Sequence, residues 1–329
     1  MDWTVFWFML PVCLVVATVA MFSGISGAAL LTPVFLIVFP LIGVPRLGTV
    51  AAIGTSLLLE TSGFGTGLYR YIKMRLVDFR TAGRLITLTV PLAVVGAVMS
   101  RHVPGQALKL GYGIAMIGLA ALLLRDKSGP ELAGEGGPGA PAANRRGADE
   151  WPSVGPGAPE PAPAIVGESD HPHAPCSTGE HRHLTAATGK VYDFCAHGLG
   201  LQRILSGGGA FLAGMISTGV GEATLPGLVQ RSRFPVAVAA ATSTVVVAGT
   251  VAGAATTHLI QLVGEGGLAA IPWNLIVWAV PGAVAGAVVG TRLQGRISEK
   301  ASRLFFSGLF AAIGLTFLLA FTVFSRTFA

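Results

Sequence analysis

Long apolar runs return along almost the whole chain, and they limit what it can fold into. A helix needs about 20 mostly apolar residues to cross the hydrocarbon core of a bilayer. Shorter apolar pieces lie near 29–43 and 204–219. The clear runs cover about 3–22, 48–69, 85–100, 106–124, 236–257, 275–290 and 304–324. The sequence therefore predicts an all-α polytopic membrane protein.

Charge points to the same class. Only 12% of the residues are charged, whereas soluble domains carry about 25%. The net charge of +6 comes from basic residues that cluster between apolar runs, as in a positive-inside topology signal. We therefore expect the lipid bilayer, and no nucleic acid, as a partner. Because Met1-Asp2-Trp3 has no basic n-region, the first run is expected to be a retained helix.

The middle of the chain has a different composition. Between residues 129 and 163, 16 of 35 residues are Gly or Pro. Such a segment buries too little apolar surface to offset the entropy lost on ordering. We expect 129–165 to be disordered and 176–197 to form a small hairpin that turns at Thr188-Gly189. The predicted organisation is a first membrane repeat at 1–124, an extramembrane insert at 125–203 and a second membrane repeat at 204–329.

The two membrane parts resemble each other in three places, in the same order along the chain. The matching pairs are Gly24–Leu30 with Gly219–Leu225, Val50–Ser56 with Val238–Ser243, and Pro91–Val98 with Pro281–Val288. Small residues are common in membrane helices, so one match alone means little. Three ordered matches predict two homologous repeats, an organisation typical of secondary transporters.

Two topologies remain open. If the Gly-rich stretches at 23–28 and 217–222 interrupt helices, each repeat has five crossings and the two are inverted. The termini then lie outside, the insert is cytoplasmic, and three basic clusters fall inside, as the positive-inside rule favours. If the short pieces do not cross, there are eight helices, four in each repeat, and the insert lies outside.

The broken segments are the best candidates for a substrate site. A break exposes backbone N–H groups, and the half-helix that follows carries a partial positive charge at its N-terminus. Two such ends facing each other could hold a small anion. The alternative is that small residues only allow close helix contact. The candidate residues are Gly24, Ser26, Gly27, Gly219 and Gly221.

Hydroxyl residues recur near the start of one helix in each repeat. Thr55-Ser56 matches Thr242-Ser243. These hydroxyls could donate hydrogen bonds to a substrate oxygen. They could equally bond to a carbonyl one turn earlier in their own helix. Their repetition favours a substrate site.

Two acidic residues lie within or beside apolar segments. A carboxylate inside a membrane is expensive, so Glu60 and Glu222 are candidates for proton coupling. The alternatives are structural pairing with a base such as Arg70 or Arg84, or an interfacial position for Glu222.

The insert offers a second kind of site, because zinc accepts sulfur and imidazole ligands together. The spacing fits no standard zinc finger, and the alternative is a flexible polar loop. No cofactor is predicted. The candidate metal ligands are Cys176, His181, His183, Cys195 and His197.

The sequence does not favour an enzyme. It has no GxxxxGK[ST] phosphate-binding loop, and its apolar helices show no nucleophile and base in a catalytic arrangement. Active transport would therefore use a gradient or a separate partner.

Two motifs resemble the sulfite exporter TauE/SafE family. The first is Phe22-Ser-Gly-Ile-Ser-Gly-Ala-Ala-Leu-Leu-Thr-Pro33 with Val50-Ala-Ala-Ile-Gly-Thr-Ser-Leu57, and the second is Gly219-Val-Gly-Glu222 with Arg233-Phe-Pro-Val-Ala-Val-Ala-Ala-Ala-Thr-Ser243. The family shows a Gly-rich break, a downstream Pro and an Ala-Val-Ala-x-x-Thr-Ser stretch in each half. The resemblance implies a multi-pass permease of the bacterial plasma (inner) membrane that moves sulfite, organosulfonates or related small anions. The long insert and the Gly-Ile-Ser-Gly break depart from the family pattern.

The favoured hypothesis is a permease for a small anionic substrate, a sulfur oxyanion, that works by alternating access. The alternative is a membrane sensor or assembly factor that uses the Cys/His insert to bind a metal or a partner. The sequence leaves the oligomeric state open.

Deleting residues 129–165 should leave folding and transport nearly unchanged, because Gly/Pro-rich segments contribute little packing. Thermal unfolding and flux of the deletion variant test this. A large fall in its unfolding temperature would show that the segment packs against the bundle.

Overall fold

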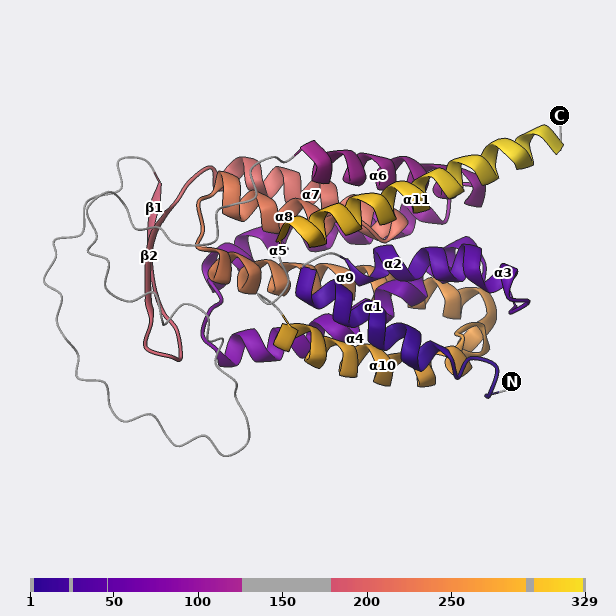
Figure 1. Ribbon diagram of the computed structural model, residues 1–329, viewed down its shortest axis with the longest axis horizontal. Coiled ribbons are helices and arrows are strands. Elements are labelled where there is room, and N and C mark those ends of the chain that lie inside the picture. Colours follow the sequence, from indigo (N-terminus) through magenta and orange to yellow (C-terminus); the bar gives the residue numbers. More distant parts are fainter. Residues whose placement is uncertain (1–2, 24–25, 46, 126–178, 294–298, 328–329) are drawn as a thin grey trace, which may run out of the picture.

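The structure is a computed structural model that describes residues 3–23, 26–45, 47–125, 179–293 and 299–327 (Figure 1). It is a bundle of helices with a two-stranded sheet at one end. Within the described residues, five helices are long and apolar enough to cross a membrane. The all-α polytopic membrane fold is thereby confirmed. The expected disordered segment 129–165, Gly24 and Cys176 lie outside the described residues.

Apart from one short helix in each half, the helical elements of the two halves follow the same order. The first half contains α1 (Met9–Ser23), α2 (Gly27–Pro33), π-helix η1 (Val34–Val38), α3 (Phe39–Leu41), α4 (Thr49–Lys73), α5 (Phe79–Ser100) and α6 (Gly105–Arg125). The second contains α7 (Leu199–Ile216), α8 (Val220–Pro226), π-helix η2 (Gly227–Arg231), α9 (Val236–Gly266), 3₁₀-helix η3 (Gly267–Ala270), α10 (Trp273–Leu293) and α11 (Glu299–Thr327). In each half, a seven-residue α-helix ends in Pro and continues as a five-residue π-helix.

Packing between the halves is reciprocal. Helix α1 packs on α10, and α7, its counterpart in the second half, packs on α5. Helix α4 contacts α9, and α6 contacts α11. Reciprocal contacts are what a two-fold axis between equivalent parts produces. The inverted orientation of the two repeats stays a prediction.

Glycines bring these helices close together. A Cβ at any of three glycines on α10 would lie 2.2–2.5 Å from a carbonyl oxygen of α1. The spacing of four residues puts these glycines on one helix face, so the two backbones touch along several turns. The glycine–carbonyl pairs are Gly282 with Leu10, Gly286 with Leu14, and Gly290 with Thr18.

Helix α7 begins five residues before the expected start of the second membrane repeat. Gly198 precedes it with φ +58°, a left-handed conformation that glycine adopts easily. Gln202 is fully buried and donates to the Ser206 hydroxyl and to carbonyls of α8. Residues 199–203 therefore belong to the bundle because Gln202 finds partners there.

A hairpin covers one end of the bundle. Strands β1 (Glu180–Thr185) and β2 (Val191–Ala196) pair antiparallel, with Arg182 opposite Phe194. Phe194 packs in one cluster with residues of α5, η2 and α9. The Ala187 N–H donates to the Met74 carbonyl at the end of α4. The hairpin thus contacts helices of both halves.

An ionic network fixes the hairpin to the first half. Asp78 caps α5 by accepting from the N–H groups of Arg80 and Thr81. Its other oxygen lies 3.3 Å from Nε of Arg182, which is 8% exposed. Glu180 pairs with both Arg182 and Arg84. The hydrogen bond from Arg84 is the main cause that lowers the pKa of the exposed Glu180 carboxyl.

Both chain ends lie at the end of the bundle opposite the hairpin (Figure 1). Basic residues gather at the hairpin end, while the opposite end carries Lys109 near the start of α6 and Arg101, which pairs with Glu265. The positive-inside rule places the more basic end in the cytoplasm. The basic residues at the hairpin end are Arg70, Lys73, Arg75, Arg80, Arg84, Arg182, Lys190, Arg203, Arg231 and Arg233.

We therefore expect the hairpin to be cytoplasmic. Thr188, in the exposed hairpin turn, and Leu268, exposed between α9 and α10, are each replaced by Cys in a background without the native cysteines. A membrane-impermeant maleimide should label Leu268→Cys in intact cells and Thr188→Cys only after permeabilisation. Ready labelling of Thr188→Cys in intact cells would show that the hairpin lies outside and that the predicted orientation is wrong.

Candidate functional site

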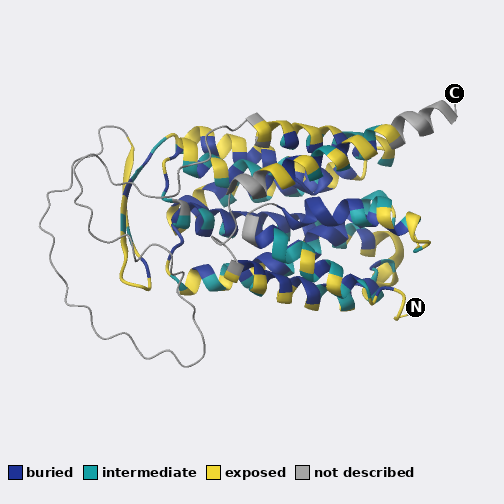
Figure 2. Ribbon diagram, in the orientation of Figure 1, coloured by how far each residue is buried: buried dark blue, intermediate teal, exposed yellow. Residues whose placement is uncertain are grey.

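The first break leads into α2, and side-chain oxygens of the protein cap the N-terminus of this helix. The Ser26 hydroxyl accepts from the Ala29 N–H. The Glu60 Oε1, from the middle of α4, accepts from the Gly27 N–H at 2.9 Å. All seven residues of α2 are buried (Figure 2). Helix ends within a membrane need such partners, because no water is there to serve.

The second break leads into α8, and Glu222 joins it to the first. Its Oε2 accepts from the Gly219 N–H at 3.1 Å, and its Oε1 accepts from the Ser26 N–H at 3.2 Å. Gly219 has φ +121°, which side chains rarely adopt, and Ser217 has φ +60°. The two breaks therefore meet, and one carboxylate bridges a donor from each half.

Hydroxyl groups also link the segments around the two breaks. Thr32 lies 2.7 Å from both Ser56 and Ser217, oxygen to oxygen. Ser56 donates its single proton to the Ile53 carbonyl, so Thr32 must donate to Ser56 and Ser217 must donate to Thr32. This chain of hydroxyls connects α2, α4 and the end of α7.

Backbone carbonyls of the two short helices accept hydrogen bonds from side chains of other helices. Pro33 has no N–H, so the Ala29 carbonyl one turn earlier lacks its usual donor. The buried Tyr112 hydroxyl, from α6, donates to that carbonyl. In the second half, the Gln202 amide donates to the carbonyls of Ala223 and Thr224. Both irregular segments are thus held by neighbouring helices.

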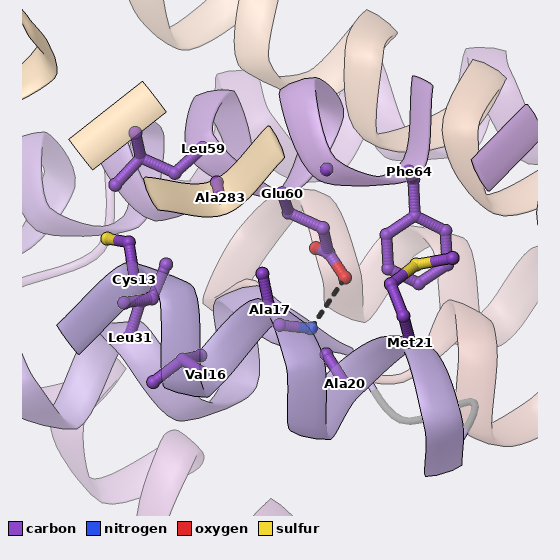
Figure 3. A pocket seen from close by; sticks show the side chains of 12 residues that line it. Cys13, Val16, Ala17, Ala20, Met21, Leu31, Leu59, Glu60, Phe64 and Ala283 are labelled. Carbon is purple, nitrogen blue, oxygen red and sulfur yellow. Dashed lines mark hydrogen bonds between the residues drawn. The ribbon is translucent and has the colours of Figure 1, made fainter. Parts of the chain in front are cut away.

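A small cavity lies beside Glu60, between α1, α2, α4 and α10 (Figure 3). Its volume is about 20 Å³, about enough for one water molecule. Its lining is almost entirely apolar, and Glu60 points into it together with Phe64 and Met21. A sulfur oxyanion does not fit in this space.

The structure brings together many of the predicted site residues. Gly221 is buried in α8, two residues after Gly219. Hydrogen bonds with Glu60 and Glu222 join Ser26, Gly27 and Gly219. Ser56 is linked to Ser26 through Thr32 and Ser217. Thr55 is buried beside Ser56. Gly24 lies outside the described residues.

Thr242 and Ser243 lie elsewhere. The Thr242 hydroxyl accepts from the Asp78 N–H, and Ser243 donates to the Ala240 carbonyl of its own helix. Helices α4 and α9 pack along each other. Gly54 contacts His258 at one end of this contact, and Tyr71 lies in one apolar cluster with Ala241 at the other end. At 1.5 Å per residue, Gly54 and Tyr71 are about 26 Å apart along α4. The two Thr-Ser pairs therefore lie at opposite ends of this contact.

The bases considered as partners for the acids are engaged elsewhere. Arg70 donates to the Val288 carbonyl and the Thr291 hydroxyl, and Arg84 pairs with Glu180. Among the described residues, neither Glu60 nor Glu222 forms an ion pair. Both carboxylates rely on backbone N–H groups.

Three buried polar atoms near the breaks have no hydrogen-bond partner among the described residues. They are Glu60 Oε2, Thr218 Oγ1 and His258 Nδ1. Thr218 lies in the second break, and His258 holds the Gly214 carbonyl near the end of α7 through its Nε2. Neither was a sequence candidate. An isolated polar residue in an apolar helix was the available signal for His258.

The predicted metal ligands of the insert are not gathered in the part of the chain that the structure describes. No three His, Cys, Asp or Glu side chains there come close enough to hold a metal ion. His183 pairs with Asp193, and His197 bonds the Cys195 carbonyl. Cys195 is disulfide-bonded, His181 lies on β1, and Cys176 lies outside the described residues.

Comparison with protein families gives one match. The family model described as sulfite exporter TauE/SafE matches residues 9–317, nearly the whole chain. No curated protein and no solved structure matches. The matched range includes both breaks and both short helices.

Replacing Thr32 by Val should destabilise the protein by about 1–3 kcal/mol, because it leaves the buried Ser217 hydroxyl without its acceptor and removes the hydroxyl that donates to Ser56. The matched control is Thr55→Val on α4, which is buried beside Ser56 without a side-chain bond to that chain of hydroxyls. Chemical unfolding in detergent compares the two variants. Equal loss in both would mean that the hydroxyl chain adds no stability.

Proposed function

The chain belongs to the sulfite exporter TauE/SafE family, and we propose that it is a plasma-membrane permease for a small sulfur oxyanion. The substrate class is sulfite, an organosulfonate or a related anion. The observation that carries the proposal is the meeting of the two breaks, where N–H groups of Ser26, Gly27 and Gly219 already hold carboxylate oxygens. Donors arranged for one oxyanion suit another.

The electrostatic field at the two breaks suits an anion, although no Lys or Arg side chain supplies a full positive charge there. Two half-helices begin here, and each contributes the partial positive charge of its N-terminus. The nearby hydroxyls of Thr55 and Ser56 could add donors after a rearrangement. A site built from dipoles releases its anion more readily than one built from a buried Arg, as transport requires.

Transport by such a site would require movement between the two halves of the protein. The cavity beside Glu60 is too small for the substrate, so the anion must enter in another conformation. The close α1–α10 and α5–α7 contacts join the halves in reciprocal pairs, which favours rocking of one unit against another. We propose alternating access coupled to a gradient, with Glu60 or Glu222 as the proton carrier.

Flux in proteoliposomes tests this function. Sulfite, sulfate, thiosulfate and ethanesulfonate are compared under an inward proton gradient, with empty liposomes as the blank. We expect uptake of at least one sulfur oxyanion. Ser26→Ala keeps the Ser26 N–H but removes the hydroxyl that accepts from the Ala29 N–H at the start of α2. Loss of this cap should weaken the apparent affinity about fivefold, the effect of one hydrogen bond of ~1 kcal/mol.

The matched control for Ser26→Ala is Thr256→Val, which removes an exposed hydroxyl that bonds only its own helix. Transport by this variant should equal that of the unmodified protein. Absence of flux for all four anions in a folded, oriented protein would contradict the permease. A partner or metal captured by the isolated membrane protein through its insert would then favour the sensor or assembly-factor alternative.

A further inference from the structure

The Glu222 carboxylate lies between the two helix breaks and accepts hydrogen bonds from both. Its two carboxylate oxygens bridge the Ser26 N–H of the first break and the Gly219 N–H of the second. Sulfite, sulfate and sulfonates also carry two or more oxygens on one central atom. One such anion could accept from both donors in the same way, so substrate and Glu222 compete for one place.

Two buried polar groups at the breaks point to a ligand independently of the helix ends. Glu60 is 4% exposed, and its Oε2 has no partner among the described residues. Thr218 lies within the second break, is 1% exposed, and its hydroxyl is likewise without a partner there. An unpaired hydroxyl is a donor ready for a substrate oxygen, and an unpaired carboxyl oxygen can accept from a protonated one.

We propose that Glu222 is a built-in substitute for the substrate, and that an oxyanion binds by displacing it once its carboxyl has taken up a proton. This rests on the proposed function and adds its coupling step. Ionised Glu222 holds both breaks together in the substrate-free protein. Protonated Glu222 accepts only weakly and leaves the two N–H groups to the anion. One proton therefore accompanies each anion.

The groups around Glu222 indicate that its own protonation state must change when an anion binds. It is partly exposed, whereas Glu60 is buried. The other titratable groups on the packed helices are Tyr112 of α6, which donates to Ala29, Cys13 of α1, and His258 of α9, which bonds Gly214. None of these pairs with Glu222, so an anion entering beside it would meet an uncompensated negative charge unless a proton came too.

The test measures ethanesulfonate binding to the purified full-length protein between pH 5 and pH 8, by calorimetry in nanodiscs. This sulfonate keeps one negative charge over the whole range, so any pH dependence belongs to the protein. In the unmodified protein the affinity should rise as pH falls, by up to about tenfold per pH unit for one linked proton. Glu222→Gln should bind at every pH with a flat profile, because its neutral amide cannot compete as an anion.

Two matched variants assign the proton. Glu265→Gln removes an exposed carboxyl at the far end of α9 and should keep the pH profile unchanged. Glu60→Gln should keep the slope, since Glu222 remains. A flat profile in Glu60→Gln with a normal slope in Glu222→Gln would place the proton on Glu60 and overturn the proposal.

The remaining outcomes separate this inference from the permease itself. Binding and flux that do not depend on pH, or a Glu222→Gln variant that is folded but binds nothing at any pH, would reject displacement and leave the permease standing. A structural role alone would lower thermal stability in Glu222→Gln without flattening the profile. No binding and no flux of any sulfur oxyanion at any pH would instead reject the permease.

Discussion

Backbone N–H groups at the two helix breaks must find acceptors at membrane depth, and the rest of the structure depends on how they do so. Hydrocarbon offers no water to satisfy them. Glu60 and Glu222 supply the acceptors, so the two costly features, open helix ends and buried carboxylates, offset each other. Each is tolerable only beside the other, which fixes α2, α4 and α8 around one point.

The same solution explains the packing around the breaks. Pro33 ends the regular hydrogen bonding of α2, and the side chains of Tyr112 and Gln202 donate to carbonyls of the two irregular segments. Glycines on α10 allow its backbone to touch α1, so that the breaks are enclosed by protein. A membrane transporter needs both features: irregular backbone to meet the substrate and close helix contact to shield it.

The hairpin has a different physical basis. It docks through Phe194 in an apolar cluster and through the buried Arg182 beside Asp78. Because it contacts α4 and α5 of one half and η2 and α9 of the other, any movement between the halves must also move or release it. The insert is therefore mechanically linked to the part of the protein that the proposed transport cycle would move.

The sequence by itself determined the helices, the membrane class and the family, because apolar runs of about 20 residues have few other solutions, and it singled out Glu60 and Glu222 because acids are rare in such runs. Only the tertiary structure decided what those acids touch. Pattern matching treated Thr55-Ser56 and Thr242-Ser243 as equivalent, yet only Ser56 reaches the breaks, while Thr242 bonds Asp78 at the hairpin end. Thr32, Ser217, Thr218 and His258 gave no repeated motif. Their roles arise from contacts between segments as much as 185 residues apart. Sequence periodicity reports which face of a helix is apolar, but the depth at which two helices meet is set by packing.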